Sequence, residues 1–251
     1  MFELSGRTAL VTGAGRGVGA EIALTLAQYG ARVAINDIDH ARAASAVERI
    51  TESGGTAVAT IADVTDASAV RAMVTDVEER LGTIDVLINN AGLPAHGMRM
   101  CAFVDSEPHE WESVLKINVD GVLQCSHAVL PGMTAQKWGR IITISSDSGR
   151  TGESRMAVYA ASKAAGAGFT RSLAKEVGPD GITCNTVSLG TILPAGADPN
   201  DERLAKHSRR YPVGRLGTPQ DIAATVLWLA SDAGSWVTGQ TIPVNGGYAT
   251  S

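Results

Sequence analysis

Short apolar runs alternate with longer helical patterns along the whole chain. The runs are bounded by polar residues or glycine, which is typical of strands buried in a sheet. Strands are expected over 7–12, 32–37, 56–62, 84–88, 139–146, 182–189 and 240–244. Helices are expected over 20–29, 40–53, 66–81, 111–133, 157–177 and 218–230. This alternation predicts an α/β protein with a doubly wound parallel sheet of about seven strands and helices on both faces.

No linker or low-complexity stretch divides the chain, so residues 1–251 are expected to form a single domain. The segment 191–216 is polar and long for a connection inside a compact domain. Loops of this length often cover binding sites, and we predict that 191–216 is a substrate lid.

Polar residues and glycines gather where the predicted strands end. They are the segment 13–19, Asp37, Asp63, Asn90 and Ser146. In a parallel sheet these ends share one edge, and ligands bind outside that edge. The convergence predicts one binding site assembled from separated segments.

Between the first strand and the first helix lies Gly13-Ala14-Gly15-Arg16-Gly17-Val18-Gly19. Gly13 permits a tight turn, Gly17 lets a phosphate approach the backbone, and Gly19 lets the helix pack closely on the strand. The N-terminus of the helix then faces an anion. We therefore predict that this loop binds a dinucleotide in a Rossmann-type fold.

Asp37 ends the second strand and is followed by Ile38, which is placed with it in the cofactor site. A carboxylate here accepts hydrogen bonds from both ribose hydroxyls of adenosine and repels a 2′-phosphate, which favours NAD over NADP. Two alternatives stay open, because Asp39 is a competing ribose contact and Arg16 is a candidate ligand for a 2′-phosphate. A third alternative is that Asp37 only caps the next helix.

Tyr159 and Lys163 are one turn apart on the helix predicted over 157–177, so they share a face. The unperturbed pKa of a tyrosine is ~10, and a neighbouring ammonium favours the phenolate. We expect Lys163 to lower the pKa of Tyr159, which then exchanges a proton with a substrate oxygen near neutral pH. Ser146 is placed to hydrogen-bond the same oxygen. An ordinary helix surface is the alternative.

Asn118 lies in the helix predicted over 111–133 and is followed by Gly121, and both residues are unfavourable inside a helix. One explanation is that Asn118 holds a water that relays protons from the region of Lys163. The alternative is a packing or turn role.

Composition narrows the class of protein. The formal net charge is −5, so no overall field attracts nucleic acid or an anionic membrane. The three cysteines (Cys101, Cys125, Cys184) and five histidines show no metal-ligand spacing, so we expect free thiols and no metal site. The N-terminus lacks a signal-peptide pattern, and no apolar run approaches ~18 residues. We therefore expect a cytoplasmic protein.

Taken together, the motifs resemble the short-chain dehydrogenases/reductases over nearly the whole chain. The resemblance is carried by Thr12-Gly13-x-x-x-Gly17-x-Gly19, Asn89-Asn90-Ala91-Gly92, Asn118, Ser146 thirteen residues before Tyr159, and Lys163. It implies hydride transfer between a nicotinamide cofactor, with NAD favoured and NADP less so, and a small-molecule carbonyl or alcohol.

The resemblance also implies a role for each of these side chains. Tyr159 is the implied acid/base, and Ser146 orients the substrate oxygen. Lys163 lowers the pKa of the tyrosine and holds the nicotinamide ribose, while Asn118 holds the relay water. Ser145 is the competing serine, one residue away from the family spacing.

Further cofactor contacts and an assembly follow from the same resemblance. Asp63 and Val64 match positions that contact adenine, and Asn90, Ala91 and Gly92 match positions that line the adenosine. Ile192 matches a residue whose backbone contacts the nicotinamide amide, and Gly190 is placed with it in the cofactor site. The segments 237–240 and 244–247 resemble the tetramer-forming end of the family, so a homotetramer is expected.

Three positions depart from the family pattern. Leu189-Gly190 stands where Pro-Gly is usual, and Pro194 stands where a Thr usually contacts the nicotinamide carboxamide. Thr191 is a candidate substitute. Asn245 stands where an Asp is common.

The substrate is predicted by class. The main prediction is a secondary alcohol interconverted with a ketone, and the alternative is a 3-oxoacyl or cyclic hydroxyacyl thioester of coenzyme A or acyl carrier protein. The lid carries Arg203, Lys206, His207, Arg209 and Arg210, which either bind the phosphates of such a thioester or form a solvated helix surface. Arg150 and Arg155 either select an acid or a thioester or are surface charges.

Two hypotheses from other classes were compared with these motifs. A non-catalytic dinucleotide-binding regulator predicts a damaged set of catalytic residues, whereas the four residues are intact here. A sugar-nucleotide epimerase or dehydratase usually has a Gly-x-x-Gly-x-x-Gly loop and a larger C-terminal domain, and this chain has neither.

Overall fold

Seven parallel strands form one sheet in the computed structural model, which describes residues 2–93, 97–193, 196–198 and 201–250. The strands are β1 (Thr8–Val11), β2 (Arg32–Asp37), β3 (Thr56–Ile61), β4 (Val86–Asn89), β5 (Gly139–Ser146), β6 (Ile182–Leu189) and β7 (Thr241–Val244). Their order is β3-β2-β1-β4-β5-β6-β7, and every neighbouring pair is parallel. The winding reverses between β1 and β4, so the predicted doubly wound sheet is confirmed.

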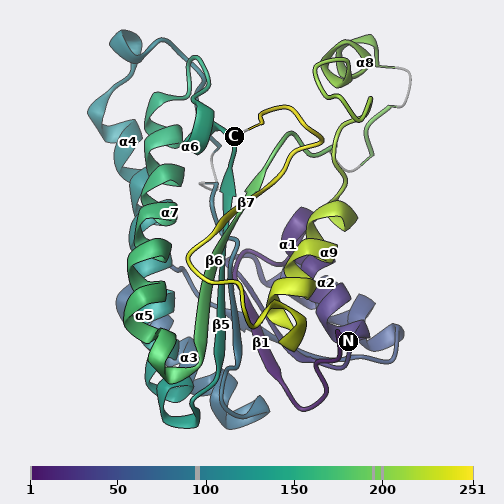
Figure 1. The fold of residues 1–251 in the computed structure, drawn as a ribbon, viewed down its shortest axis with the longest axis vertical. Helices are drawn as coiled ribbons and strands as arrows, with labels where there is room; N and C mark the ends of the chain where they lie inside the picture. Colours follow the sequence, from purple (N-terminus) through teal and green to yellow (C-terminus); the bar gives the residue numbers. More distant parts are fainter. Residues whose placement is uncertain (1, 94–96, 194–195, 199–200, 251) are drawn as a thin grey trace.

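Helices cover both faces of this sheet (Figure 1). They are α1 (Gly17–Gln28), α2 (His40–Glu52), α3 (Ala67–Leu81), α4 (Pro108–Leu115), α5 (Gly121–Gln136), α6 (Ser148–Thr151), α7 (Ala157–Val177), α8 (Glu202–Ser208) and α9 (Pro219–Ala230), with short turns η1 (Phe103–Asp105), η3 (Gly178–Asp180) and η4 (Asp232–Gly234). The helices α1, α2 and α9 form one core with the sheet, and α3, α5 and α7 form another on the opposite face. In Figure 1, α8 stands apart from both layers.

The apolar spacing of the helices explains these layers. The buried residues of α3 are Val70, Met73, Val74, Val77 and Leu81, which lie along one side of the helix. At its start, Asp66 accepts hydrogen bonds from the backbone N–H groups of Ser68 and Ala69. Gly82 follows its last residue with a φ of 85°, which favours glycine. The helix expected over 66–81 therefore begins one residue later than predicted and ends at the predicted residue.

The helix predicted over 111–133 is built differently. It begins at Pro108 and ends at Gln136, and a π-helical turn, η2 (Lys116–Asp120), separates α4 from α5. Asn118 lies in this turn and is buried. Such turns are rare and frequently mark functional sites. The short helix α6 forms in a segment where the sequence predicts none, and α8 forms in the segment 191–216, for which a solvated helix was one of the two alternatives.

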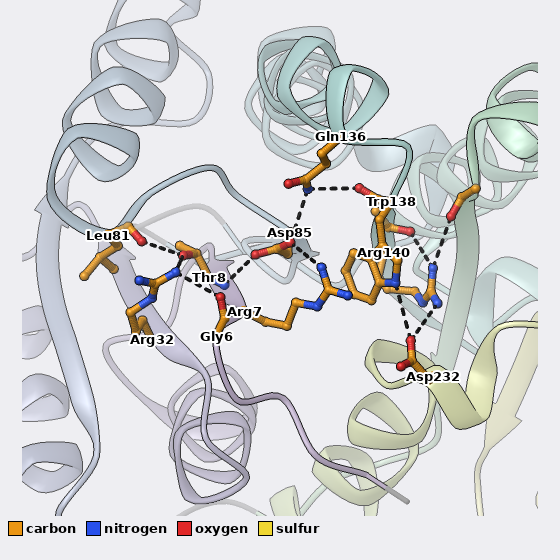
Figure 2. A network of polar contacts seen from close by, with 12 residues as sticks. Gly6, Arg7, Thr8, Arg32, Leu81, Asp85, Gln136, Trp138, Arg140 and Asp232 are labelled. Atoms are coloured by element: carbon orange, nitrogen blue, oxygen red, sulfur yellow. Dashed lines mark hydrogen bonds and ion pairs between the residues drawn. The ribbon is translucent and has the colours of Figure 1, made fainter.

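A polar network joins the amino-terminal ends of the strands (Figure 2). Asp85 accepts a hydrogen bond from Arg7 Nη1 at 2.9 Å. The guanidinium carbons of Arg7 and Arg140 lie 3.6 and 4.2 Å from the centroid of the Trp138 ring. Arg140 also pairs with Asp232 at 3.6 Å. This network stabilises the amino-terminal edge of the sheet, and the predicted site lies at the other edge.

Candidate active site

Ser146, Tyr159, Lys163 and Asn118 lie together at the carboxyl ends of the central strands. Ser146 is the last residue of β5, Tyr159 and Lys163 belong to α7, and Asn118 belongs to η2. The Ser146 side chain hydrogen-bonds the Tyr159 phenol, and Lys163 Nζ lies 5.7 Å from the centroid of the Tyr159 ring. The fold thus gathers side chains that are up to 45 positions apart, since 163 − 118 = 45.

Gly92, which follows β4, lies between Lys163 and Asn118. A Cβ atom at Gly92 would lie 2.6 Å from Lys163 Nζ and 2.9 Å from Asn118 Oδ1, so a larger residue does not fit. Asn118 Nδ2 donates to the Val114 carbonyl at 3.0 Å, whereas its buried Oδ1 has no hydrogen-bond partner among the described residues. An unpaired buried acceptor is costly. Its place near the Lys163 ammonium fits the predicted proton relay.

Lys163 is a buried charge. Its Nζ donates to the Ile144 carbonyl at 3.1 Å, and only 8% of the residue is exposed. Burial lowers the pKa of Lys163 from 10.5 to about 8. The group is therefore mostly protonated at neutral pH and loses its proton at a lower pH than an exposed lysine does.

The pKa of Tyr159 differs from the sequence prediction. Burial raises the pKa of this phenol above its ordinary value of 10, and the hydrogen bond from Ser146 offsets the rise only in part. The predicted net lowering of this pKa is wrong, because desolvation outweighs the stabilising effects on the phenolate, and the ammonium nitrogen of Lys163 lies 5.7 Å from the ring centroid. At neutral pH Tyr159 is a protonated acid, the form that donates a proton to a carbonyl oxygen.

The two serines at the end of β5 have different partners. Ser145 is buried, and its Oγ donates to the Lys163 carbonyl at 3.1 Å. Ser146 hydrogen-bonds the Tyr159 phenol, and its Oγ accepts a hydrogen bond from the Ser148 N–H at 3.3 Å. The serine that contacts the phenol is therefore Ser146.

The glycine loop between β1 and α1 packs closely against the segment after β4. A Cβ atom at Gly13 would lie 2.9 Å from Ala91 Cα, and one at Gly19 would lie 2.4 Å from Asn90 Nδ2. Gly17 has a φ of 58°, with open space where a side chain would stand. A phosphate can approach the backbone there, in front of the N-terminus of α1. These features fit a pyrophosphate.

Asn90 braces this loop. Its Nδ2 donates to the carbonyls of Thr12 at 2.9 Å and Gly13 at 3.0 Å. The backbone N–H groups of Asn90 and Ala91 both donate to Thr12 Oγ1. The amide of Asn90 therefore fixes the loop that is predicted to bind the cofactor.

Asp37 binds the glycine loop and does not cap α2. Its Oδ2 accepts the Gly15 N–H at 3.1 Å, and its Oδ1 accepts the Asp39 N–H at 3.0 Å. The N-cap of α2 is Asp39, which accepts the Arg42 N–H and pairs with the Arg42 guanidinium at 3.3 Å. The alternative in which Asp37 serves only as a cap is therefore wrong. Arg16 is exposed just before α1.

The other residues predicted to contact the adenosine lie beyond the ends of β2 and β3. Ile38 follows Asp37 and has 55% of its surface exposed. Asp63 is exposed, and Val64 beside it is buried. A Cβ atom at Gly121 would lie 2.9 Å from Val64 Cγ2, so this loop packs directly on the start of α5.

Gly190 and Ile192, predicted to lie near the nicotinamide, follow β6. A Cβ atom at Gly190 would lie 3.0 Å from Asn245 Cα, so the C-terminal segment packs against this turn. Ile192 forms an isolated parallel bridge with Gly217. Pro194 lies outside the described residues.

Thr191, the candidate contact for the carboxamide, is hydrogen-bonded to two later residues of the segment 191–216. Its N–H donates to the Tyr211 hydroxyl at 3.0 Å, and its Oγ1 hydrogen-bonds His207 Nε2 at 3.0 Å. The His207 and Tyr211 rings contact each other edge-on. Movement of the segment that carries α8 would therefore move Thr191.

A cavity of about 430 Å³ opens beside Tyr159, and most of its lining residues belong to no motif in the sequence. Its apolar lining includes Met98, Phe103, Trp111, Val114 and Met156. The rings of Phe103 and Trp111 are stacked with centroids 5.2 Å apart. The sequence signal for this cavity is that Phe103 and Trp111 lie within nine positions of each other in a chain with only 4% aromatic residues.

The charges around this cavity are unevenly paired. Arg99 Nε and Glu110 form an ion pair at 2.9 Å. Arg155 also lines the cavity and has a φ of 67°, an uncommon backbone conformation for a residue other than glycine. The lining is therefore mostly apolar, and it carries the Arg99–Glu110 ion pair and a second arginine, Arg155.

Cys125 and Cys184 are buried free thiols, and burial raises the pKa of both to about 12. They stay protonated and unreactive near neutral pH. The described residues contain no cluster of three or more His, Cys, Asp or Glu side chains that would hold a metal ion.

The structural features of this edge fit a nicotinamide dinucleotide. The open backbone at Gly17 is suited to the pyrophosphate, and the carboxylate of Asp37 lies beside the same loop. The unpaired Asn118 Oδ1 and the Lys163 ammonium lie near the reacting end, on the side of Tyr159. A dinucleotide bound along this edge would extend from Asp37 to Tyr159.

Comparison with known proteins identifies the family. The profile of the family described as "Enoyl-(Acyl carrier protein) reductase" matches residues 13–249. The chain is 41% identical over 243 residues to 3-oxoacyl-(acyl-carrier-protein) reductase FabG of Staphylococcus aureus, covering 96% of this chain and 97% of that protein. It is 39% identical to the Vibrio harveyi protein of the same name, covering 98% of both chains.

Solved structures agree with this assignment. A short-chain type dehydrogenase/reductase from Mycobacterium marinum superposes with a TM-score of 0.91 at 34% identity, covering 100% of this chain and 98% of that one. A putative short-chain alcohol dehydrogenase from Sinorhizobium meliloti gives a TM-score of 0.91 at 33% identity, covering 98% of both chains. The chain therefore belongs to the short-chain dehydrogenase/reductase family, and it is an oxidoreductase that uses a nicotinamide dinucleotide.

Proposed function

We propose that this protein reduces 3-oxoacyl thioesters to 3-hydroxyacyl thioesters. The observation that carries the proposal is the mostly apolar cavity of about 430 Å³ that Tyr159 helps to line. It offers an acyl group apolar walls while its carbonyl lies at the acid. The names of the relatives that are 39–41% identical to the chain support the same substrate class.

In the proposed reaction each site residue acts on the substrate carbonyl or on a group that contacts it. The nicotinamide, when bound, supplies a hydride to the carbonyl carbon. Tyr159, protonated at neutral pH, donates its proton to the carbonyl oxygen, and Ser146 hydrogen-bonds that oxygen. The Lys163 ammonium stabilises the phenolate that remains. The Oδ1 of Asn118 is unpaired among the described residues and lies near Lys163, where it would hold the water that relays a proton back to the site.

The positive charges on the predicted lid favour a substrate that is attached to a phosphate-bearing carrier. Arg203 in α8 has 95% of its side chain exposed, and Lys206 lies in the last turn of the same helix. Exposed cations of this kind can bind the phosphates of coenzyme A or of the phosphopantetheine of acyl carrier protein. A small ketone lacks such a group and would use only the cavity.

The test compares two carbonyl substrates, with NADH and NADPH in parallel. We expect turnover of acetoacetyl-coenzyme A with kcat/KM about 100-fold or more above that for cyclohexanone, because remote contacts contribute to transition-state binding. Turnover of cyclohexanone alone would overturn the thioester proposal. It would favour a second candidate, a secondary-alcohol dehydrogenase, which is the class named for the Sinorhizobium meliloti relative.

We also propose that NAD(H) is the preferred cofactor, because the Asp37 carboxylate lies beside the glycine loop. Asp37→Ala is expected to raise the ratio of kcat/KM with NADPH to that with NADH by about 10- to 100-fold, through loss of charged hydrogen bonds to the ribose. Steady-state kinetics with both cofactors measure this ratio. Asp39→Ala is the matched control and should leave the ratio unchanged. An unchanged ratio in Asp37→Ala would assign the preference to Asp39 or Arg16.

The finer predictions of assembly and location belong to the same proposal. We place the protein in the cytoplasm as a homotetramer that binds neither nucleic acid nor membrane. None of the described helices is long and apolar enough to cross a membrane. Trp236, next to the predicted tetramer-forming end, has 98% of its surface exposed in the single chain. Sedimentation analysis of the purified protein measures the assembly.

A further inference from the structure

Asp147 is a buried carboxylate that follows Ser146 directly. Only 3% of the residue is exposed. Its Oδ1 accepts hydrogen bonds from Ser188 Oγ at 2.8 Å and from Arg150 Nη1 at 3.1 Å. Its Oδ2 accepts a hydrogen bond from Asn245 Nδ2 at 2.5 Å. A buried charge is costly unless it is paired, and three side chains pair with this carboxylate.

The partners of Asp147 come from different parts of the fold. Ser188 lies in β6, Arg150 lies in α6, and Asn245 follows β7. The Asp147 N–H also donates to the Leu189 carbonyl at 2.9 Å, so main chain and side chain are both fixed. The carboxylate thus joins the end of β5 to β6 and to the C-terminal segment.

The short helix α6 transmits this anchoring to Ser146. The Asp147 carbonyl accepts the N–H groups of Arg150 and Thr151, which holds the helix together. From that helix, Ser148 donates to Ser146 Oγ through its N–H at 3.3 Å and through its hydroxyl at 3.0 Å. The Ser146 hydroxyl therefore has its direction set by a helix that Asp147 holds in place.

Gly149 fixes the other side of α6. A Cβ atom there would lie 2.9 Å from the Ala164 nitrogen and 3.0 Å from the Lys163 carbonyl carbon, so α6 packs backbone to backbone on α7. Small displacements of α6 would therefore change the geometry between Ser146 and Tyr159. A misplacement of about 1 Å in an active site can cost about 100-fold in rate.

We propose that Asp147 is a positioning residue, which with Asn245 sets the direction of the Ser146 hydroxyl toward the substrate oxygen. The inference rests on the proposed carbonyl reduction. It also explains why an asparagine stands at 245. Asn245 Nδ2 donates to Asp147 and to the Ala249 carbonyl, and its Oδ1 accepts the Gly247 N–H. An aspartate at 245 would place two carboxylates against each other.

The test uses Asp147→Asn, Asn245→Asp and the double variant that combines them. In Asp147→Asn an amide group replaces the acceptor of the Asn245 amide, and Arg150 loses its ion pair. We expect kcat to fall by about 10- to 100-fold while KM for NADH stays unchanged, since the glycine loop is not involved. Asp76→Asn, which removes an exposed carboxylate on α3, is the matched control.

The pH dependence of kcat in Asn245→Asp distinguishes a positioning role of Asp147 from a role in packing alone. Two carboxylates in contact share a proton, so the apparent pKa of the pair rises. We expect kcat to fall as pH rises through that pKa, in a range where the wild type does not change. The double variant places an amide opposite a carboxylate again and should recover at least about 10-fold of the loss.

Other ionisable groups around this cluster must be considered when the profile is read. They are Arg150 on α6, Tyr159 and Lys163 on α7, Tyr211 against Gly190 and Gly246, and the hydrogen-bonded set Glu153, Tyr248 and Arg210. None of these differs between Asn245→Asp and the wild type. A difference between the two profiles therefore belongs to the new carboxylate.

A readout without substrate keeps this inference distinct from the proposed function. The ionisation of Tyr159 can be followed by phenolate absorbance, with Tyr159→Phe as the blank. Loss of the Ser146 hydrogen bond should raise the pKa of Tyr159 in Asp147→Asn, as it should in Ser146→Ala. Wild-type protein that reduces neither carbonyl would overturn the proposed function alone. An unchanged phenol titration in Asp147→Asn, or a pH profile of Asn245→Asp parallel to that of the wild type, would overturn the positioning role.

Discussion

Replacing Tyr159 with phenylalanine is expected to lower kcat for carbonyl reduction by about 1,000-fold, because positioned proton transfer contributes about 10²- to 10⁴-fold. The substitution removes one hydroxyl and keeps the ring that lines the cavity. Without the phenol, the oxygen that receives negative charge during hydride transfer loses the acid assigned to protonate it. Ser146 can still hydrogen-bond that oxygen, which leaves a residual rate.

The measurement separates chemistry from binding. NADH affinity, followed by the fluorescence of the bound cofactor, should match that of the wild type, because the glycine loop and Asp37 are untouched. Tyr29→Phe is a control on an exposed tyrosine after α1 and should keep full activity. A kcat close to that of the wild type in Tyr159→Phe would remove Tyr159 from the mechanism.

The sheet was predictable because each strand carries its own apolar signal. The predicted bounds of β2, β5 and β6 are the observed ones, 32–37, 139–146 and 182–189. These strands are almost wholly buried, and β2 and β5 carry apolar runs that end at polar residues, whereas β6 mixes apolar residues with small polar ones. The strand ends then share one edge, which is how Asp37, Asn90 and Ser146 were assigned to a common site.

The π turn was less predictable, because periodicity over 111–133 does not reveal one extra residue in a turn. Asn118 and Gly121 are unfavourable inside a helix, and the structure gives the reason for their presence. The turn directs Asn118 toward Lys163, and Gly121 allows close contact with Val64. Local propensity pointed to the right place, but tertiary contacts determined the conformation.

Contacts between distant residues and the extent of side-chain burial could not be predicted from the sequence. The hydrogen bond between Asp147 and Asn245 joins residues 98 positions apart, and neither residue has a local pattern that indicates the other. The sequence also predicts the wrong direction for the shift in the pKa of Tyr159. Spacing on a helix shows that Lys163 is near, but it does not show how far both groups are removed from water.

Lys163→Met is expected to make the protein more stable at pH 7 while removing most of its activity. The pKa of Lys163 is lowered from 10.5 to about 8 by burial. A difference of this size corresponds to about 3 kcal/mol of destabilisation when the lysine is charged. The loss of the donor to the Ile144 carbonyl costs about 1 kcal/mol in the variant. The expected net gain in the free energy of unfolding at pH 7 is about 2 kcal/mol.

The free energy of unfolding of the wild type depends on pH through the titration of Lys163. Between pH about 8 and 10.5 the unfolded chain holds a proton on Lys163 that the folded chain has released, so wild-type stability rises with pH in this window. Below about 8 the full cost is present, and above 10.5 it is absent. The advantage of Lys163→Met should therefore be largest at pH 7 and disappear near pH 10.5.

Urea unfolding at pH 7 and pH 10 measures this difference, with Lys175→Met as the control, since that lysine is exposed on the same helix. The control should show no such dependence on pH. If Lys163→Met were less stable than the wild type at pH 7, the hydrogen bonds of Nζ would outweigh the cost of its burial. A gain in stability together with a loss of kcat would instead show that this buried ammonium is retained for catalysis at the expense of stability. We expect that outcome because the Lys163 ammonium is held beside Tyr159 and Asn118. Among the described residues, its only hydrogen-bond acceptor is one backbone carbonyl.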